Sequence, residues 1–95
     1  MAPSKLAKQT RKDARRDAAA AHQLALWYFR GQEGLSQDNR LALQWTRDAA
    51  ERGFVDAQAT LGAAYFRGLV GVQPVDRARA FAWFRKAALQ GWAIH

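Results

Sequence analysis

The sequence predicts an all-α protein, a short α-solenoid of two helical hairpins preceded by a basic N-terminal helix or arm. Three observations support this prediction. The segment LALWYFRG at 24–31 returns as LGAAYFRG at 61–68, and a longer stretch at 38–54 returns at 76–92. Apolar residues within both copies follow the 3.6-residue period of a helix. A glycine follows each helical stretch, where a left-handed backbone is easily adopted.

The N-terminal segment, residues 1–19, is expected to be a basic arm or a capping helix. It contributes +4 to the chain's net charge of +7. On a helix at 100° per residue, its basic residues fall within an arc of about 140°. These residues are Lys5, Lys8, Arg11, Lys12, Arg15 and Arg16. Thr10 and Asp13 have the spacing of a capping box, so a helix is predicted to begin near residue 10 and run to Leu24.

The first repeat, residues 20–54, is predicted to hold two helices joined by the linker QEGLSQ. Asp38 stands where the second helix begins and suits its free N–H groups and positive dipole end. The apolar face of that helix carries Ala42, Trp45, Ala49 and Ala50 at helical spacing.

The second repeat, residues 55–91, follows the same plan, with Asp76 at the start of its second helix. Small residues are expected to let the helices approach closely, while Trp45 and Trp83 fill the wedge between units. The predicted interior comprises Leu24, Tyr28, Trp45, Ala49, Ala50, Leu61, Gly62, Tyr65, Trp83, Phe84, Ala87 and Ala88. Residues 92–95 are expected to begin a further helix that the sequence cuts short.

The stretch LGAAYFRGLVGVQPVDRARAFAWFRKAALQG resembles a Sel1-like repeat, a relative of the tetratricopeptide repeat. That family shows L-G-x-x-Y-x-x-G, a short Gly-Val-x-x-Asp loop, and then A-x-x-W-[YF]-x-K-A-A-x-x-G. The first copy departs from this pattern at Ala25, Thr46 and Asp48, where the family has Gly, an aromatic residue and Lys. The resemblance covers residues from about 20 to 92, and it implies stacked hairpins that act as a scaffold or adaptor for other proteins.

The residues available for catalysis are few. The chain has no cysteine, two histidines (His22 and His95) and no phosphate-loop or metalloprotease motif. Asp48 and Glu51 are expected to face solvent near arginines rather than to form a catalytic pair. An enzyme is therefore not expected, and neither is a cofactor or a metal. No apolar run is long enough for a membrane span, and the lack of cysteine favours the cytoplasm.

Leu26 and Trp27 are surplus to the repeat pattern, because the second copy has alanine at both places. The resemblance implies that the first helix of each unit lines the concave face, where such residues meet a partner protein or peptide. The predicted contact residues are Leu26, Trp27, Tyr28, Arg30 and Arg67, with Trp92 at the C-terminal edge. Trp27 and Leu26 packing against the N-terminal helix is the alternative interpretation.

Two further partners remain open at this point. Trp92 gives the last hairpin an apolar edge that a second copy of the chain, or residues beyond this sequence, would cover. The basic residues of the N-terminal segment offer phosphate-tracking binding to a nucleic acid. The segment has no aromatic residue to stack on bases, so nucleic-acid binding is the alternative function and protein binding the leading one.

Overall fold

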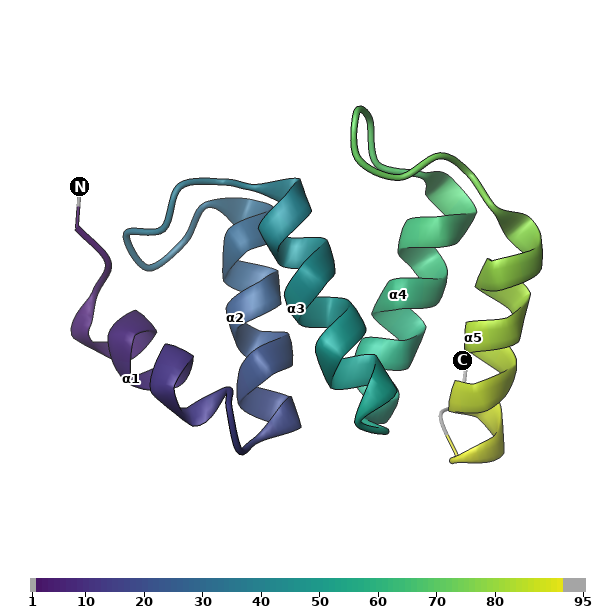
Figure 1. Ribbon diagram of the computed structural model, residues 1–95, viewed down its shortest axis with the longest axis horizontal. Coiled ribbons are helices and arrows are strands. Elements are labelled where there is room, and N and C mark those ends of the chain that lie inside the picture. The colour runs from purple at the N-terminus through teal and green to yellow at the C-terminus, as the bar shows by residue number, and fades with distance from the viewer. Residues whose placement is uncertain (1, 92–95) are drawn as a thin grey trace.

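The computed structural model describes residues 2–91, which form five helices arranged in chain order along one row (Figure 1). The helices are α1 (Lys5–Asp13), α2 (Ala18–Arg30), α3 (Asn39–Glu51), α4 (Val55–Arg67) and α5 (Arg77–Leu89). Within residues 2–91 the only strand-like feature is an isolated antiparallel bridge between Leu69 and Gln73. The predicted all-α class is confirmed.

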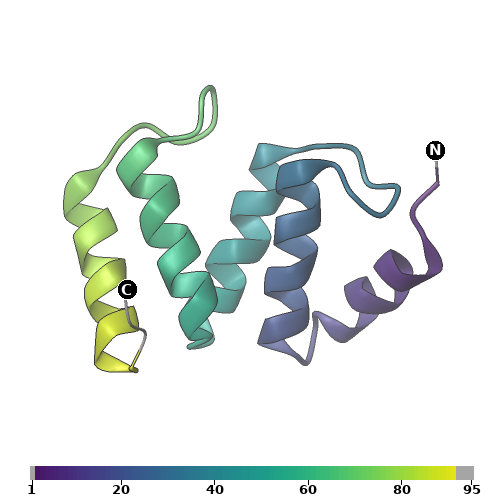
Figure 2. The same ribbon diagram turned by 180° about the vertical axis from the view of Figure 1, so that it is seen from behind.

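The helices pack as two hairpins, α2 with α3 and α4 with α5. Helix α3 also packs on α4, and α1 packs on α2. The first helices of the hairpins, α2 and α4, contact each other, whereas α3 and α5 do not. The row is therefore curved with α2 and α4 on its concave side, and Figure 2 shows these two helices in front of α3.

Four helices begin at a residue whose side chain accepts a hydrogen bond from a backbone N–H of the first turn. Their N-caps are Ser4, Asp17, Asp38 and Asp76. The prediction of one helix from residue 10 to Leu24 is wrong. Ser4 starts α1 six residues earlier, and Asp17 interrupts the chain by accepting from the Ala19 N–H and starting α2.

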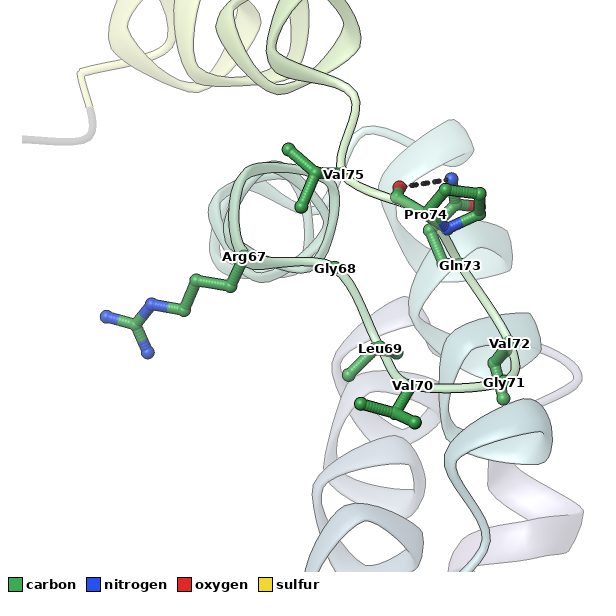
Figure 3. A pocket seen from close by; sticks show the side chains of 9 residues that line it. All are labelled: Arg67, Gly68, Leu69, Val70, Gly71, Val72, Gln73, Pro74 and Val75. Atoms are coloured by element: carbon green, nitrogen blue, oxygen red, sulfur yellow. Dashed lines mark hydrogen bonds between the residues drawn. The ribbon is translucent and has the colours of Figure 1, made fainter.

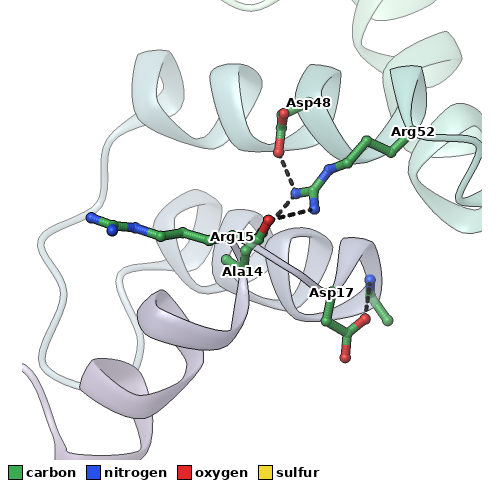
Figure 4. Close-up of polar contacts among 6 residues, drawn as sticks. Ala14, Arg15, Asp17, Asp48 and Arg52 are labelled. Carbon is green, nitrogen blue, oxygen red and sulfur yellow. Dashed lines mark hydrogen bonds and ion pairs between the residues drawn. The ribbon is translucent and has the colours of Figure 1, made fainter.

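Helix α1 is fixed to the first hairpin at both of its ends. At its start, Ser4 Oγ donates to Glu33 Oε1 over 2.9 Å, in the loop between α2 and α3. At its end, Arg52, the residue that follows α3, donates through Nη2 to the Ala14 carbonyl over 2.7 Å and also pairs with Asp48 (Figure 4). The carbonyl of Ala14, the C-cap residue of α1, thus finds a donor, and α1 is held against the first hairpin.

The interior of the row holds a tyrosine from each first helix, bonded to an arginine of the preceding helix. Arg11 Nη2 donates to Tyr28 Oη over 2.6 Å, and Arg47 Nη2 donates to Tyr65 Oη over 3.1 Å. Helix α1 therefore makes with α2 the same arginine–tyrosine contact that α3 makes with α4. It occupies the place that the second helix of a preceding repeat would fill.

Most of the predicted interior positions are buried, and Leu24 and Leu61 are fully inaccessible to solvent. Trp45 and Trp83 are half-buried and pack against this interior. Ala88 is a correction, because it is exposed. It lies on the outer face of α5, and no helix among residues 2–91 packs on that face.

Two departures of the first repeat from the family pattern form a matched pair. A Cβ at Gly62 would lie 2.8 Å from Cδ1 and Cε1 of the Phe84 ring, so the aromatic residue requires glycine opposite it. In the first repeat, the equivalent residues are Ala25 and Thr46, both fully buried. Thr46 donates to the Ala42 carbonyl over 2.8 Å, which satisfies its hydroxyl. A smaller residue on α3 thus accompanies the larger one on α2.

Candidate functional site

A shallow hollow of about 190 Å³ lies on the concave side between α2 and α4. Phe29 of α2 lines one side, and Thr60, Ala63 and Ala64 of α4 line the other. Phe29 is half-buried and packs against the interior of the row. The α4 residues Thr60, Ala63 and Ala64 have short side chains, which leaves room beside Phe29, and Arg67 borders the hollow at the end of the same helix.

A second hollow, of about 520 Å³, is formed by the segment from Arg67 to Val75 that joins α4 to α5 (Figure 3). Leu69 and Gln73 bond each other's backbone over 2.7 and 2.8 Å, which closes the tip into a tight loop. Val70 at this tip is 99% exposed, and Val75 is also largely exposed. Exposed β-branched side chains on an ordered loop are apolar surface available for contact.

Arg67 belongs to both hollows and joins them into one surface. Its side chain extends away from the loop (Figure 3), and it has no hydrogen bond or ion pair within residues 2–91. Arg30 at the end of α2 is also exposed, and it too has no hydrogen bond or ion pair in this part of the chain. The surface therefore combines apolar walls with guanidinium groups whose donors are free for an acidic or carbonyl acceptor.

Leu26 and Trp27 occupy on α2 the places that Ala63 and Ala64 occupy on α4. Ala64 is 8% exposed and borders the hollow beside α2. Among the helices of residues 2–91, only α4 packs against α2 as another first helix, and the side of α2 away from α4 carries the larger residues. Trp27 is half-buried and packs against the interior, and Leu26 is half-buried as well. Part of each side chain stays exposed.

The two remaining cases among the predicted contact residues are Tyr28 and Trp92. Tyr28 is 7% exposed and its hydroxyl accepts from Arg11, so it is an interior residue and leaves the set of contact candidates. Trp92 lies outside the residues that the structure describes.

His22 links the two first helices beneath the concave face. Its Nε2 lies 2.9 Å from Thr60 Oγ1, and its ring packs at a tilt on Phe54, with 5.5 Å between centroids. Burial lowers the pKa of His22 below its usual value, and the charge of Asp56 offsets part of this effect. The lowered pKa favours the neutral form of His22. Because the Thr60 hydroxyl donates to the Asp56 carbonyl over 3.0 Å, the contact with His22 is satisfied when Nε2–H donates to Thr60 Oγ1.

The six basic residues predicted to track phosphate are all exposed, and four of them lie around one hollow of about 720 Å³. The lining residues are Arg11, Lys12, Asp13, Arg15, Arg16 and Asp17. Two carboxylates therefore share the hollow with the cations. Asp17 is occupied in capping α2, and Arg11 is occupied by the hydroxyl of Tyr28.

The described residues contain no group of three or more His, Asp or Glu side chains that would hold a metal. None of the helices formed by residues 2–91 is long and apolar enough to cross a bilayer. Asp48, which the sequence placed at the surface, is exposed and pairs with Arg52.

The sequence reasoning missed Phe29, Leu69 and Val70 as parts of the surface. One signal was available, because the linker LVGVQPV is apolar where the first repeat has the polar linker QEGLSQ.

The family model described as Sel1 repeat matches residues 18–54 and 55–92. A chitin synthase regulator of Malassezia restricta is 32% identical over 80% of this chain, and chitin synthase regulatory factor 3 of Schizosaccharomyces pombe is 33% identical over the same share. The chain spans only 5% and 8% of these two proteins.

Two solved structures share the fold over 90% of this chain. One is c5321, a protective antigen of uropathogenic Escherichia coli with the SLR fold, at 39% identity and a TM-score of 0.82. The other is a Sel1 repeat protein of Oxalobacter formigenes, at 37% identity and a TM-score of 0.81. The chain covers 18% of the first and 63% of the second.

Proposed function

Because the chain belongs to the Sel1 repeat family, we propose that it is a non-enzymatic interaction module that binds a segment of another protein on its concave face. Sel1 repeats are generally protein-interaction modules. The two curated relatives are named as regulators of an enzyme, which favours a binding role over catalysis by the repeats. The cytoplasmic location expected from the absence of cysteine is part of this proposal.

The joined hollows around Arg67 are the observation that supports the proposal. Phe29, Leu69 and Val75 supply apolar walls, and Arg67 supplies unpaired donors between them. A partner segment that fits has an apolar side chain beside a carboxylate, because apolar burial and a charge-assisted hydrogen bond are then gained together. Arginine and aromatic residues are also the types most enriched at binding hot spots.

Two substitutions test this surface without disturbing the interior. Arg67→Glu reverses its charge, and Ala63→Leu fills the smaller hollow with the side chain that the first repeat carries at Leu26. Proteins captured from the source cell by the wild type should be lost with both variants and kept with Arg16→Glu, a matched charge reversal on the far side of α2. Direct titration of the captured protein then confirms the effect. Equal capture by all four proteins would contradict the proposal.

Nucleic-acid binding through α1 remains a second candidate, favoured by the four cations around one hollow. Deleting α1 is a poor test, because Ala7, Thr10 and Ala14 are buried and the deletion would uncover α2. Replacing the five residues other than Arg11 by Gln removes the charge and keeps the bond to Tyr28. If the candidate is right, binding to a labelled RNA or DNA oligonucleotide is strong at low salt and disappears in this variant.

A further inference from the structure

The outer face of α5 repeats the face of α3 that α4 covers. On α3, Leu43 is 4% exposed and Ala50 is 1% exposed. The equivalent residues of α5, at an offset of 38, are Phe81, which is 60% exposed, and Ala88, which is also exposed. This helical face is thus covered by a neighbouring helix on α3, whereas on α5 it is exposed.

A specific polar contact recurs wherever such a face is covered. Arg11 and Arg47 each donate to the hydroxyl of a tyrosine on the following helix. The third arginine of the series is Arg85, which is exposed and has no hydrogen bond or ion pair within residues 2–91. Covering α3 also brings a side-chain amide of α4, Gln58 Nε2, to the Ala50 carbonyl at 3.2 Å.

We propose that the outer face of α5 is a second docking surface, which takes an acidic amphipathic helix of another protein in the way that α3 takes α4. The tyrosine hydroxyl of that helix accepts from Arg85, and its apolar face covers Phe81 and Ala88. This surface is distinct from the concave face around Arg67, and the proposal goes beyond the function proposed above.

The required sequence of the partner helix follows from the first junction. Phe29 lies opposite the short side chains of α4, and Ala64 directly precedes Tyr65. Phe66 is the equivalent of Phe29, and its ring lies 6.2 Å from that of Phe81. The partner helix therefore needs a small residue directly before its tyrosine, because a large residue there would collide with Phe66.

This requirement argues against a second copy of the chain as the occupant. Helix α4 has the small residue and the tyrosine, but α3 of the same chain already covers it. Helix α2 is covered by α1, and Trp27 stands directly before Tyr28 where the contact needs a small residue.

Charge leads to the same conclusion. Residues 77–91 contain Arg77, Arg79, Arg85 and Lys86 and no acidic residue, and the whole chain has a net charge of +7. By contrast, α3 balances Arg40 and Arg47 with Asp48 and Glu51. A second copy would be repelled at this end of the row, whereas an acidic helix would be attracted.

The test uses a labelled peptide that copies residues 54–67, with Glu in place of Arg67 and a side-chain staple on its solvent face to keep it helical. We expect the full chain to bind this peptide, as measured by fluorescence anisotropy. Changing the peptide's tyrosine to Phe, or the chain's Arg85 to Ala, should each weaken binding about tenfold, and both together should weaken it no further.

Three chain variants act as controls on the same measurement. Phe81→Glu should abolish binding, whereas Arg16→Ala should leave it nearly unchanged. Arg67→Glu, which disrupts the concave surface, should also leave it nearly unchanged, so the two proposals can fail independently.

Several results would overturn the inference. These are an absence of binding by the wild type, an equal loss with Arg85→Ala and Arg16→Ala, or equal binding of a peptide that keeps Arg67 and carries Lys in place of Asp56. Sedimentation of the chain alone provides a further test. If the chain self-associates and Phe81→Glu abolishes this association, the occupant of the α5 face is a second copy and the inference is wrong.

Discussion

The contact between Gly62 and Phe84 allows a quantitative test of how the two repeats differ. Changing Gly62 to Ala has two opposing effects on the free energy of unfolding. Alanine in a helix interior is favoured over glycine by about 1 kcal/mol. The new Cβ, however, would lie 2.8 Å from two carbons of the Phe84 ring, and overpacking of this kind costs about 1–3 kcal/mol. Gly62→Ala should therefore lower the stability of the wild type by up to about 2 kcal/mol.

The same substitution should have the opposite sign when the ring is absent. In a Phe84→Thr background, which copies Thr46 of the first repeat, only the helix-propensity gain of about 1 kcal/mol remains. The coupling between the two positions is then about 1–3 kcal/mol, within the range of residues in direct contact. Urea unfolding of the four proteins of this cycle, followed by circular dichroism at 222 nm, measures it.

Ala25→Gly in the first repeat is the matched control. It removes a methyl group from a helix interior and should cost about 1 kcal/mol. If Gly62→Ala changes the stability equally in the presence and absence of Phe84, the ring does not require glycine. The explanation given for the paired departures in the first repeat would then be wrong.

Three further predictions concern α1, His22 and Trp27. Arg52→Ala removes the donor to the Ala14 carbonyl, so amide exchange should accelerate in α1 and stay unchanged in α5, with a loss of about 1–2 kcal/mol. Because burial lowers the pKa of His22, the unfolded chain binds a proton before the folded one does as the pH falls. Stability should thus be full above about pH 6.5 and decline below it, and His22→Gln should flatten this dependence in unfolding experiments from pH 5 to 8. Trp27→Ala should keep the helical circular dichroism spectrum and cost about 1–2 kcal/mol, because the ring is only half-buried; complete unfolding would instead make Trp27 an essential interior residue.

The hairpins could be predicted from the sequence because their signals are local and occur twice. Helical periodicity, the N-capping residues Asp38 and Asp76 and the repeated LxxxYFRG segment all specify the same elements. The N-terminal helix occurs once and lacked that support. Its boundaries depend on Ser4 and Asp17, and a spacing rule applied to Thr10 and Asp13 pointed to a different start.

The candidate surfaces depend on contacts between repeats, which no single segment contains. Tyr28 fits the repeat pattern and a contact role equally well until Arg11 is placed against its hydroxyl. Ala88 has the spacing of an interior residue, but only a neighbouring helix could bury it. The hollow beside Phe29 depends on Ala63 and Ala64 facing another helix, and periodicity within one helix does not show which neighbour each face meets.

The two ends of the row of residues 2–91 differ in the helix that forms each end and in how far its outer face is exposed. At the N-terminal end, α1 takes the place of a preceding repeat and repeats its arginine–tyrosine bond, while Trp27 fills space that a small residue leaves open elsewhere. At the end formed by α5, Arg85 is the third arginine of the series, and its face remains exposed. On α3 the same face is covered by α4, and Leu43 and Ala50 are buried there. Docking by this geometry is therefore possible at α5. A helix that binds should therefore extend the row beyond α5.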